Sequence, residues 1–198
     1  MNFLAHLYLS GNHPDVMVGN FIGDFVKGRD LQSKFASGIA LGVEMHRGID
    51  AFTDHHRVMK QSKDRLRPKY RHYSGVITDI FYDHFLAADW SAWSEEPLAL
   101  YAARTYQLVI DQEAVMPERV KQMLPYMMRD NWLVNYGNIE GIQRALSGMA
   151  RRASFESKME ESVEDLKNSY SEFRGEFDRF FPELKNWADE WLLKNIPA

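Results

Sequence analysis

Residues 75–90, GVITDIFYDHFLAADW, decide the fold class of this chain. Apolar residues recur here at helical spacing, and at about 100° per residue Val76, Leu86 and Trp90 share a face with Asp79 and Asp83. Two carboxylates one helical turn apart repel each other, and apolar neighbours raise the cost of their charge unless a cation or another partner compensates. The stretch therefore predicts a helix that carries a functional site.

Helical periodicity continues through the rest of the chain, whereas clean alternating runs are scarce. We expect an all-α fold of roughly eight to ten helices, with boundaries uncertain by about two to four residues. Pro68 is expected to keep the polar residues 57–73 from forming a helix. The predicted helices cover residues 2–9, 15–26, 31–55, 75–90, 97–115, 138–151 and 157–180, with a shorter one between Pro117 and Pro125 and a last one from near Pro182 to about residue 194.

Composition narrows the class of protein. A length of 198 residues, 45% of them hydrophobic, predicts one domain over residues 1–198 with a sizeable core. The net charge of −4 gives no electrostatic reason to expect nucleic acid or a membrane as partner. The absence of cysteine excludes disulfides, thiolate ligands and cysteine nucleophiles. The opening MNFLAHLYLSG lacks the basic flank of a signal peptide, and no run of about 18 apolar residues follows, so we expect a soluble cytoplasmic protein.

A second polar pair, His46 and Asp50, lies four residues apart on one face of a predicted helix. Such a pair can hold one cation, or the carboxylate can orient the imidazole; the alternative is an ordinary hydrogen bond on the helix surface. Asp24 and His6 are further candidates, with a helix-end carboxylate and a core histidine as their alternatives. Nitrogen and oxygen donors without sulfur suit Mn²⁺, Mg²⁺, Fe²⁺ or Zn²⁺ alike. A cation held this way favours hydrolysis, because it lowers the pKa of a bound water and neutralises charge on a phosphoryl oxygen.

Residues 57–71 form a basic stretch in this acidic chain. They carry seven lysines and arginines against one acid, Asp64, and His72 follows. The alternatives are a solvated loop and a landing surface that steers an anionic partner to the site. On the second interpretation, the side chains that bind the substrate include Arg57, Lys60, Lys63, Arg65 and Arg67.

Four ordered segments carry a resemblance to a known family. They are NFLAHLYLS (2–10), GNFIGDFVKG (19–28), MHRGIDAFTD (45–54) and DIFYDHFLA (79–87), and NWLVNYGNIEGIQRALSGMARR (131–152) adds a later match. Together they resemble the bacterial acyl carrier protein phosphodiesterases over most of residues 1–152. The resemblance implies an all-helical fold related to the HD-domain metal-dependent phosphohydrolases. It also implies a reaction, in which hydrolysis of the phosphodiester between 4′-phosphopantetheine and a serine of holo acyl carrier protein gives the apo protein, with Mn²⁺ as the metal.

The resemblance and the residues together give an expected site. HD-domain proteins place an adjacent His–Asp pair at the metal, and here the adjacent pair, Asp83–His84, has the reverse order. His84 or His6 is expected to assist proton transfer to the leaving serine oxygen, and Arg47 or Arg57 to hold the phosphodiester. The metal ligands, around one or two ions, are expected to be Asp24, His46, Asp50, Asp79 and Asp83.

Two other functions fit the same residues. One is an HD-like phosphohydrolase that acts on a nucleotide or another small phosphodiester and needs no basic docking surface. The other is a non-catalytic helical protein that binds the carrier protein and whose acidic residues only stabilise the fold.

Overall fold

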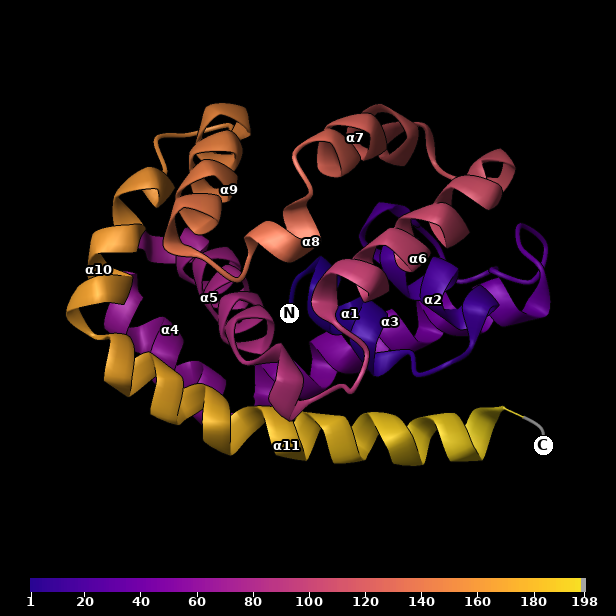
Figure 1. Cartoon of the computed structure of the whole chain (residues 1–198), viewed down its shortest axis with the longest axis horizontal. Helices are drawn as coiled ribbons and strands as arrows, with labels where there is room; N and C mark the ends of the chain where they lie inside the picture. The colour runs from indigo at the N-terminus through magenta and orange to yellow at the C-terminus, as the bar shows by residue number, and fades with distance from the viewer. Residues whose placement is uncertain (197–198) are drawn as a thin grey trace.

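The computed structural model describes residues 1–196, and over that range it consists of helices, turns and loops without a strand (Figure 1). The all-α prediction is confirmed. No helix in the described part of the chain combines the length and apolarity that crossing a membrane requires. The α-helices are α1 (Phe3–Leu9), α2 (Pro14–Ile22), α3 (Ser37–His55), α4 (Arg57–Tyr70), α5 (Ser74–Ala88), α6 (Leu98–Asp111), α7 (Glu118–Arg129), α8 (Trp132–Asn135), α9 (Ile139–Arg152), α10 (Ser162–Asn168) and α11 (Tyr170–Asn195).

Helices α2 and α3 pack with their backbones almost in contact. A methyl group added at Gly19 would lie 2.0 Å from the carbonyl oxygen of Ile39, and one added at Gly42 would lie 2.2 Å from that of Val16. Only glycine permits so close an approach. The contact brings the middle of α3, which carries His46 and Asp50, against the C-terminal end of α2.

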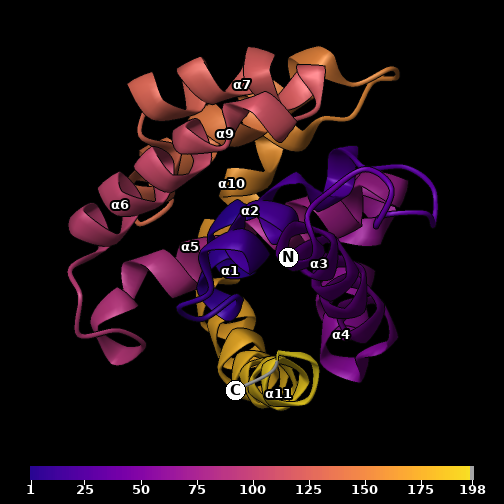
Figure 2. The ribbon, with the colours of Figure 1, turned by 90° about the vertical axis from the view of Figure 1, so that its right-hand side faces the viewer.

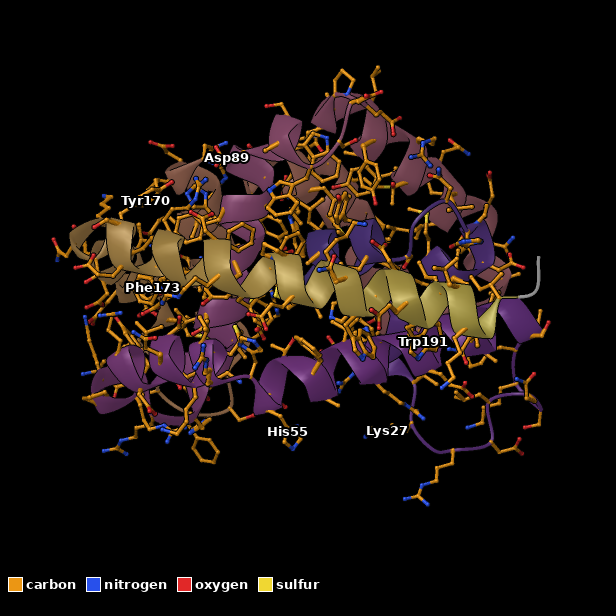
Figure 3. All side chains as sticks on the ribbon, turned by 90° about the horizontal axis from the view of Figure 1, so that it is seen from below. Lys27, His55, Asp89, Tyr170, Phe173 and Trp191 are labelled. Atoms are coloured by element: carbon orange, nitrogen blue, oxygen red, sulfur yellow. The ribbon has the colours of Figure 1, made fainter. Side chains whose placement is uncertain are left out.

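The buried apolar side chains form one continuous core, which α11 closes along one side of the molecule. Figures 1 and 2 show α11 on the opposite side from α7 and α9. Seen from below, Tyr170 and Phe173 lie near the first turn of α11 and Trp191 near its other end (Figure 3). The aromatic side chains that α11 buries completely are Phe173, Phe177, Phe180 and Phe181.

Three prolines predicted to end or delimit helices lie inside them instead. Pro68 is in α4, Pro125 in α7 and Pro182 in α11. A proline inside a helix costs about 3 kcal/mol, whereas burial of one large apolar side chain contributes about 1.5–3 kcal/mol. Around Pro182 alone, Phe180, Phe181 and Leu184 are fully buried, so tertiary packing outweighs the local penalty.

Other boundaries were also wrong. Residues 57–70 form the helix α4 rather than a loop, and residues 31–36 form turns rather than the start of α3. The predicted helix over 157–180 is divided at Ser169, where α10 ends and α11 begins. The relation to HD-domain phosphohydrolases stays a prediction.

Candidate metal centre

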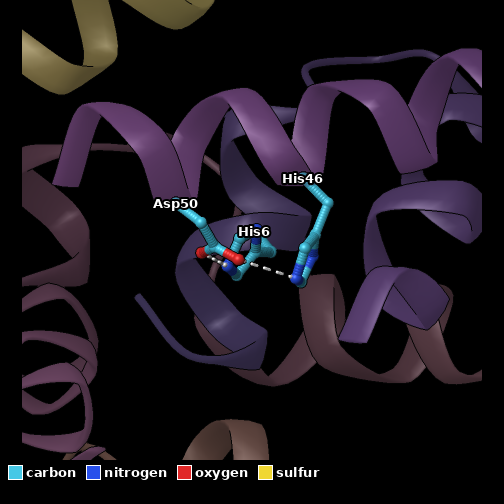
Figure 4. A group of neighbouring side chains, drawn as sticks. All are labelled: His6, His46 and Asp50. Carbon is cyan, nitrogen blue, oxygen red and sulfur yellow. Dashed lines mark ion pairs between the residues drawn. The ribbon is translucent and has the colours of Figure 1, made fainter. Parts of the chain in front are cut away.

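Three side chains from two helices converge at the edge of the core, where His6 and His46 are buried and the side chain of Asp50 is 42% exposed. His6 comes from α1, and His46 and Asp50 come from α3 (Figure 4). One potential ligand atom from each lies within 4.8 Å of the other two. Nε2 of His6 is 3.4 Å from Oδ1 of Asp50, and Nε2 of His46 is 3.2 Å from Oδ2. The two imidazoles stack, with ring centroids 4.0 Å apart and planes inclined by 15°, so both Nε2 atoms face one carboxylate.

Asn20, a fully buried residue of α2, fixes both rings. Its side-chain nitrogen donates to the backbone oxygen of His6 at 2.8 Å and to Oγ of Ser10 at 2.9 Å, which leaves Oδ1 as an acceptor. That oxygen lies 2.7 Å from Nδ1 of His6, and the backbone oxygen of Asn20 lies 2.7 Å from Nδ1 of His46. Because both oxygens accept, both Nδ1 atoms carry hydrogen and present Nε2 toward Asp50. Asn20 was not among the site residues predicted from the sequence.

Gly23 makes room for the His46 ring. A methyl group at Gly23 would lie 2.2 Å from Cγ of His46. The next residue, Asp24, places Oδ1 3.2 Å from Nε2 of His46, although its side chain is 68% exposed. The short η1 turn (Gly23–Phe25) thus admits the ring and also brings a second carboxylate to it.

The centre is strongly polarised. Burial and the neighbouring His46 lower the pKa of His6 to about 4, so His6 is neutral near pH 7. Burial alone would lower the pKa of His46, but hydrogen bonds to Asp24 and Asp50 outweigh it and raise that pKa to about 9. Burial favours the neutral form of Asp50, yet the hydrogen bond from His46 and the proximity of His6 lower its pKa overall. Metal-free, His46 is therefore an imidazolium between two carboxylates.

These residues suit a divalent cation. Nε2 of His6 is buried and makes no hydrogen bond to any described residue. The 3.4 Å approach of Asp50 is too long to satisfy it, and a neutral His6 has no proton to donate there. Two ligands of one cation lie roughly 3 Å apart when each bond is about 2.0–2.2 Å long. Neutral imidazole nitrogens oriented by Nδ1–H bonds, facing a carboxylate, form an ordinary donor set for Zn²⁺, Mn²⁺ or Fe²⁺.

A pocket of about 330 Å³ opens beside this group. Asp24 and Asp50 line it together with Asp79 of α5, so three of the predicted carboxylates share one cavity. Asp79 also lies 3.1 Å from the amino group of Met1, and burial raises its pKa. The remaining lining residues are Met1, Asn2, Phe3, Thr53, Asp54, Val76 and Met149.

Asp83, predicted as a metal ligand, and His84, predicted to assist proton transfer, are not part of the His6–His46–Asp50 group. Asp83 is fully buried, and its oxygens accept the backbone N–H groups of Asn2 at 3.1 Å and Leu4 at 2.8 Å. Burial raises its pKa to about 7. His84 places Nδ1 2.8 Å from the backbone oxygen of Tyr136 and Nε2 3.0 Å from the hydroxyl of Tyr170. With these atoms already occupied, we leave Asp83 and His84 out of the proposed centre.

The predicted cationic residues are mostly engaged as well. Arg47 donates to the backbone oxygens of Val26 at 3.3 Å and Gly28 at 2.7 Å and so fastens the loop that follows Asp24. On α4 most of the predicted substrate-binding cations already have carboxylate partners. These pairs are Lys60–Asp64, Lys63–Asp54 at 2.7 Å, Arg65 with the buried Glu176, and Arg67–Asp64 at 3.5 Å, while Arg57 has no ion pair among residues 1–196.

The fold and the pocket define a class: an all-helical protein with a histidine- and carboxylate-lined candidate metal centre. A family model described as acyl carrier protein phosphodiesterase matches residues 1–184. This chain therefore belongs to the acyl carrier protein phosphodiesterase family, and the resemblance found in the sequence is confirmed.

Curated relatives of that name match over nearly the whole chain. The relative from Klebsiella pneumoniae (strain 342) is 33% identical over 194 residues, which cover 98% of this chain and 100% of the relative. The relative from Escherichia coli O6:H1 is 31% identical over 194 residues, which cover 98% of this chain and 100% of the relative. The relative from Photorhabdus laumondii is 30% identical over 192 residues, which cover 96% of this chain and 96% of the relative. No solved structure matches.

Proposed function

We propose that this protein hydrolyses the phosphodiester between 4′-phosphopantetheine and the serine of holo acyl carrier protein in a reaction that requires a divalent cation, with Mn²⁺ as the expected metal. Membership of the family and the names of the relatives support the reaction class and the carrier protein as substrate. The observation that carries the metal requirement is the orphaned Nε2 of His6, which faces Asp50 beside a pocket lined by further carboxylates.

His6, His46 and Asp50 would hold the cation, with Asp24 as the fourth candidate donor because it shares Nε2 of His46 with Asp50. A bound divalent cation supplies charge neutralisation at a phosphoryl oxygen and a lowered pKa for water. Asn20 contributes by holding both imidazoles in the tautomer that leaves Nε2 free.

Asp79 replaces His84 as the group proposed for proton transfer to the leaving serine oxygen. It lines the same pocket as Asp24 and Asp50 but comes from a different helix, α5. Burial raises the pKa of Asp79, which favours its protonated form, and a protonated carboxyl group can donate a proton to the leaving oxygen. His6 is less suited to this role, because its free nitrogen points at Asp50 and its pKa is about 4.

The direct test is incubation of the protein with holo carrier protein and Mn²⁺, followed by mass spectrometry of the carrier protein. We expect loss of the prosthetic group with Mn²⁺ and none after chelation. The Asp50→Asn variant should be inactive, whereas Asp30→Asn, in an exposed loop, should match the wild type. Intact holo carrier protein after incubation with the metal-loaded wild type would refute the proposal. A parallel incubation with a chromogenic diester separates this function from action on small phosphodiesters alone.

A further inference from the structure

A second cavity, of about 510 Å³, lies between α7, α8 and α9. Met149 lines both this cavity and the pocket at the candidate metal centre, so the two adjoin. Figure 1 shows α7 and α9 on the side of the molecule away from α11, with α8 between them. Six side chains give the cavity its character: Arg129, Arg144, Arg151 and Arg152, with Tyr126 and Trp132.

Positive charge in this groove is largely uncompensated. Arg129 pairs with Asp130, the one acidic residue that lines the cavity. Within residues 1–196, Arg144, Arg151 and Arg152 have no carboxylate within ion-pair distance, and all three are exposed. A concave surface lined by one sign of charge concentrates its electrostatic potential and attracts an anionic partner. The cations of α4 differ, because most of them are already paired.

We propose that the α7–α8–α9 groove docks an acidic surface of the carrier protein, so that the phosphodiester of that protein enters the adjoining pocket. This inference rests on the proposed function. The prosthetic arm beyond its phosphate is a neutral amide chain, which does not account for three unpaired guanidinium groups. Carboxylate-rich protein surfaces do match them, because arginine binds carboxylates in a planar, bidentate manner.

Aromatic side chains around the groove also suit a protein partner. Tyr126, on α7, is 57% exposed, and Trp132, at the start of α8, lines the groove with it. Arginine and large aromatic residues are enriched in the parts of protein interfaces that contribute most to binding. The groove thus combines these residue types next to the pocket, whereas α4 offers mainly charges already neutralised by its neighbours.

The test compares three variants that each remove two positive charges. Arg151→Gln/Arg152→Gln should raise KM for holo carrier protein about tenfold or more and weaken its salt dependence. Its hydrolysis of bis(p-nitrophenyl) phosphate with Mn²⁺ should stay at the wild-type rate, which also shows that the variant folds. The matched control, Arg179→Gln/Lys194→Gln, lies on α11 and should leave KM for the carrier protein within about twofold. The third variant, Lys60→Gln/Arg67→Gln, tests α4.

Several outcomes would overturn the groove as the docking site. They are an unchanged KM in the Arg151/Arg152 variant, a larger rise in the α4 variant, or an equal loss of small-diester hydrolysis, which would place the arginines at the phosphodiester itself. Titration calorimetry with the carrier protein separates this inference from the proposed function. Binding that depends on Arg151 and Arg152 without release of the prosthetic group would refute only the function. Release with unchanged binding in the variant would refute only the groove.

Discussion

The side-chain oxygen of Asn20 accepts the Nδ1 proton of His6 at 2.7 Å and thereby fixes which nitrogen His6 presents to Asp50. The backbone oxygen of Asn20 does the same for His46. One buried amide residue on α2 therefore sets the tautomer of two histidines from two other helices. In metal sites such outer partners orient the ligands and raise their basicity.

Replacement of Asn20 by Ala should therefore damage metal binding before it destroys the fold. We expect Mn²⁺ affinity to fall about 10- to 100-fold. The free energy of unfolding should fall by about 1–3 kcal/mol, because the backbone oxygen of His6 and Oγ of Ser10 lose a buried donor. Titration calorimetry and urea unfolding measure the two effects. Asn195→Ala, near the end of α11, is the control, and equal Mn²⁺ affinity in both variants would contradict the role of Asn20.

Gly23→Ala should abolish turnover through steric displacement of His46, since the added methyl group would lie 2.2 Å from Cγ of the ring. The backbone φ of Gly23 is −53°, so the expected effect comes from the ring and not from backbone strain. Gly175→Ala is a matched control, because apart from its own helix backbone and chain neighbours no atom lies within 4 Å of the added methyl group. That control should gain up to about 1 kcal/mol of stability from helix propensity. A Gly23→Ala enzyme with wild-type kcat and Mn²⁺ affinity would show that the ring is not confined there.

Asp83→Asn should destabilise the protein without weakening metal binding. The carboxylate accepts two backbone N–H groups at the start of α1, and the amide that replaces it would turn an NH₂ group toward one of them. A loss of about 1–3 kcal/mol in the free energy of unfolding is expected. Calorimetry should show Mn²⁺ affinity within about twofold of wild type, whereas Asp50→Asn should reduce it strongly. An equal loss of Mn²⁺ affinity in the two variants would indicate that Asp83 is a metal ligand.

The metal-free protein should lose stability as pH rises from 7 to 9. His46 has a folded-state pKa of about 9 against 6.5 when unfolded, so its stabilising charge is fully present below pH 6.5 and is lost through pH 9. The fall attributable to His46 should be roughly 2–3 kcal/mol in this window. In the folded protein His6 has a pKa of about 4 and Asp83 a pKa of about 7, so neither loses most of its proton between pH 7 and 9. The nearby carboxylates raise the pKa of the Met1 amino group above its ordinary value, and its titration lowers stability in the same direction in both proteins compared below. Urea unfolding of wild type and His46→Gln at pH 7 and 9 measures the difference, and parallel curves for the two proteins would contradict it.

The same proton competes with the metal, so Mn²⁺ affinity should increase as pH rises toward 9. Asp24→Asn removes one of the two carboxylates that raise the pKa of His46. In that variant the rise in Mn²⁺ affinity should occur at a lower pH than in the wild type. Calorimetric titrations between pH 6.5 and 9 in two buffers of different ionisation enthalpy would also report the proton released. A Mn²⁺ affinity that did not change with pH would mean that metal binding does not displace the proton of His46.

The sequence was sufficient for the class of fold and for part of the site. Periodicity located most helices, and the four-residue spacing of His46 and Asp50 correctly placed them on one face of α3. The same spacing in α5 gave no sign that α1 lies against α5, where the backbone N–H groups of Asn2 and Leu4 donate to Asp83. Which neighbour each turn of a helix meets is set by tertiary packing, and spacing along one helix carries no information about it.

Long-range contacts explain the other misses. Asn20 is a polar residue in the otherwise apolar segment VMVGNFI, which was the available signal, but its partners lie on α1 and α3. The basic residues 57–71 looked like a free patch because only Asp64 among their carboxylate partners lies within that stretch. The others include Asp54, Glu176 and Asp165, and the last two are more than 90 residues from the cations they pair with. Nothing in the sequence distinguishes Arg144, Arg151 and Arg152 of α9 as unpaired, and only the fold shows that they have no carboxylate partner among residues 1–196.

Electron paramagnetic resonance of bound Mn²⁺ tests the central claim most directly, because its electron spin-echo modulation reports nitrogen nuclei in the ligand shell. The account predicts nitrogen coupling from two imidazoles in the wild type, from one in His6→Ala, and no change in His72→Ala, whose histidine is exposed on η2 (Arg71–Tyr73). Wild-type affinity and an unchanged nitrogen signal in both His6→Ala and His46→Ala would contradict it.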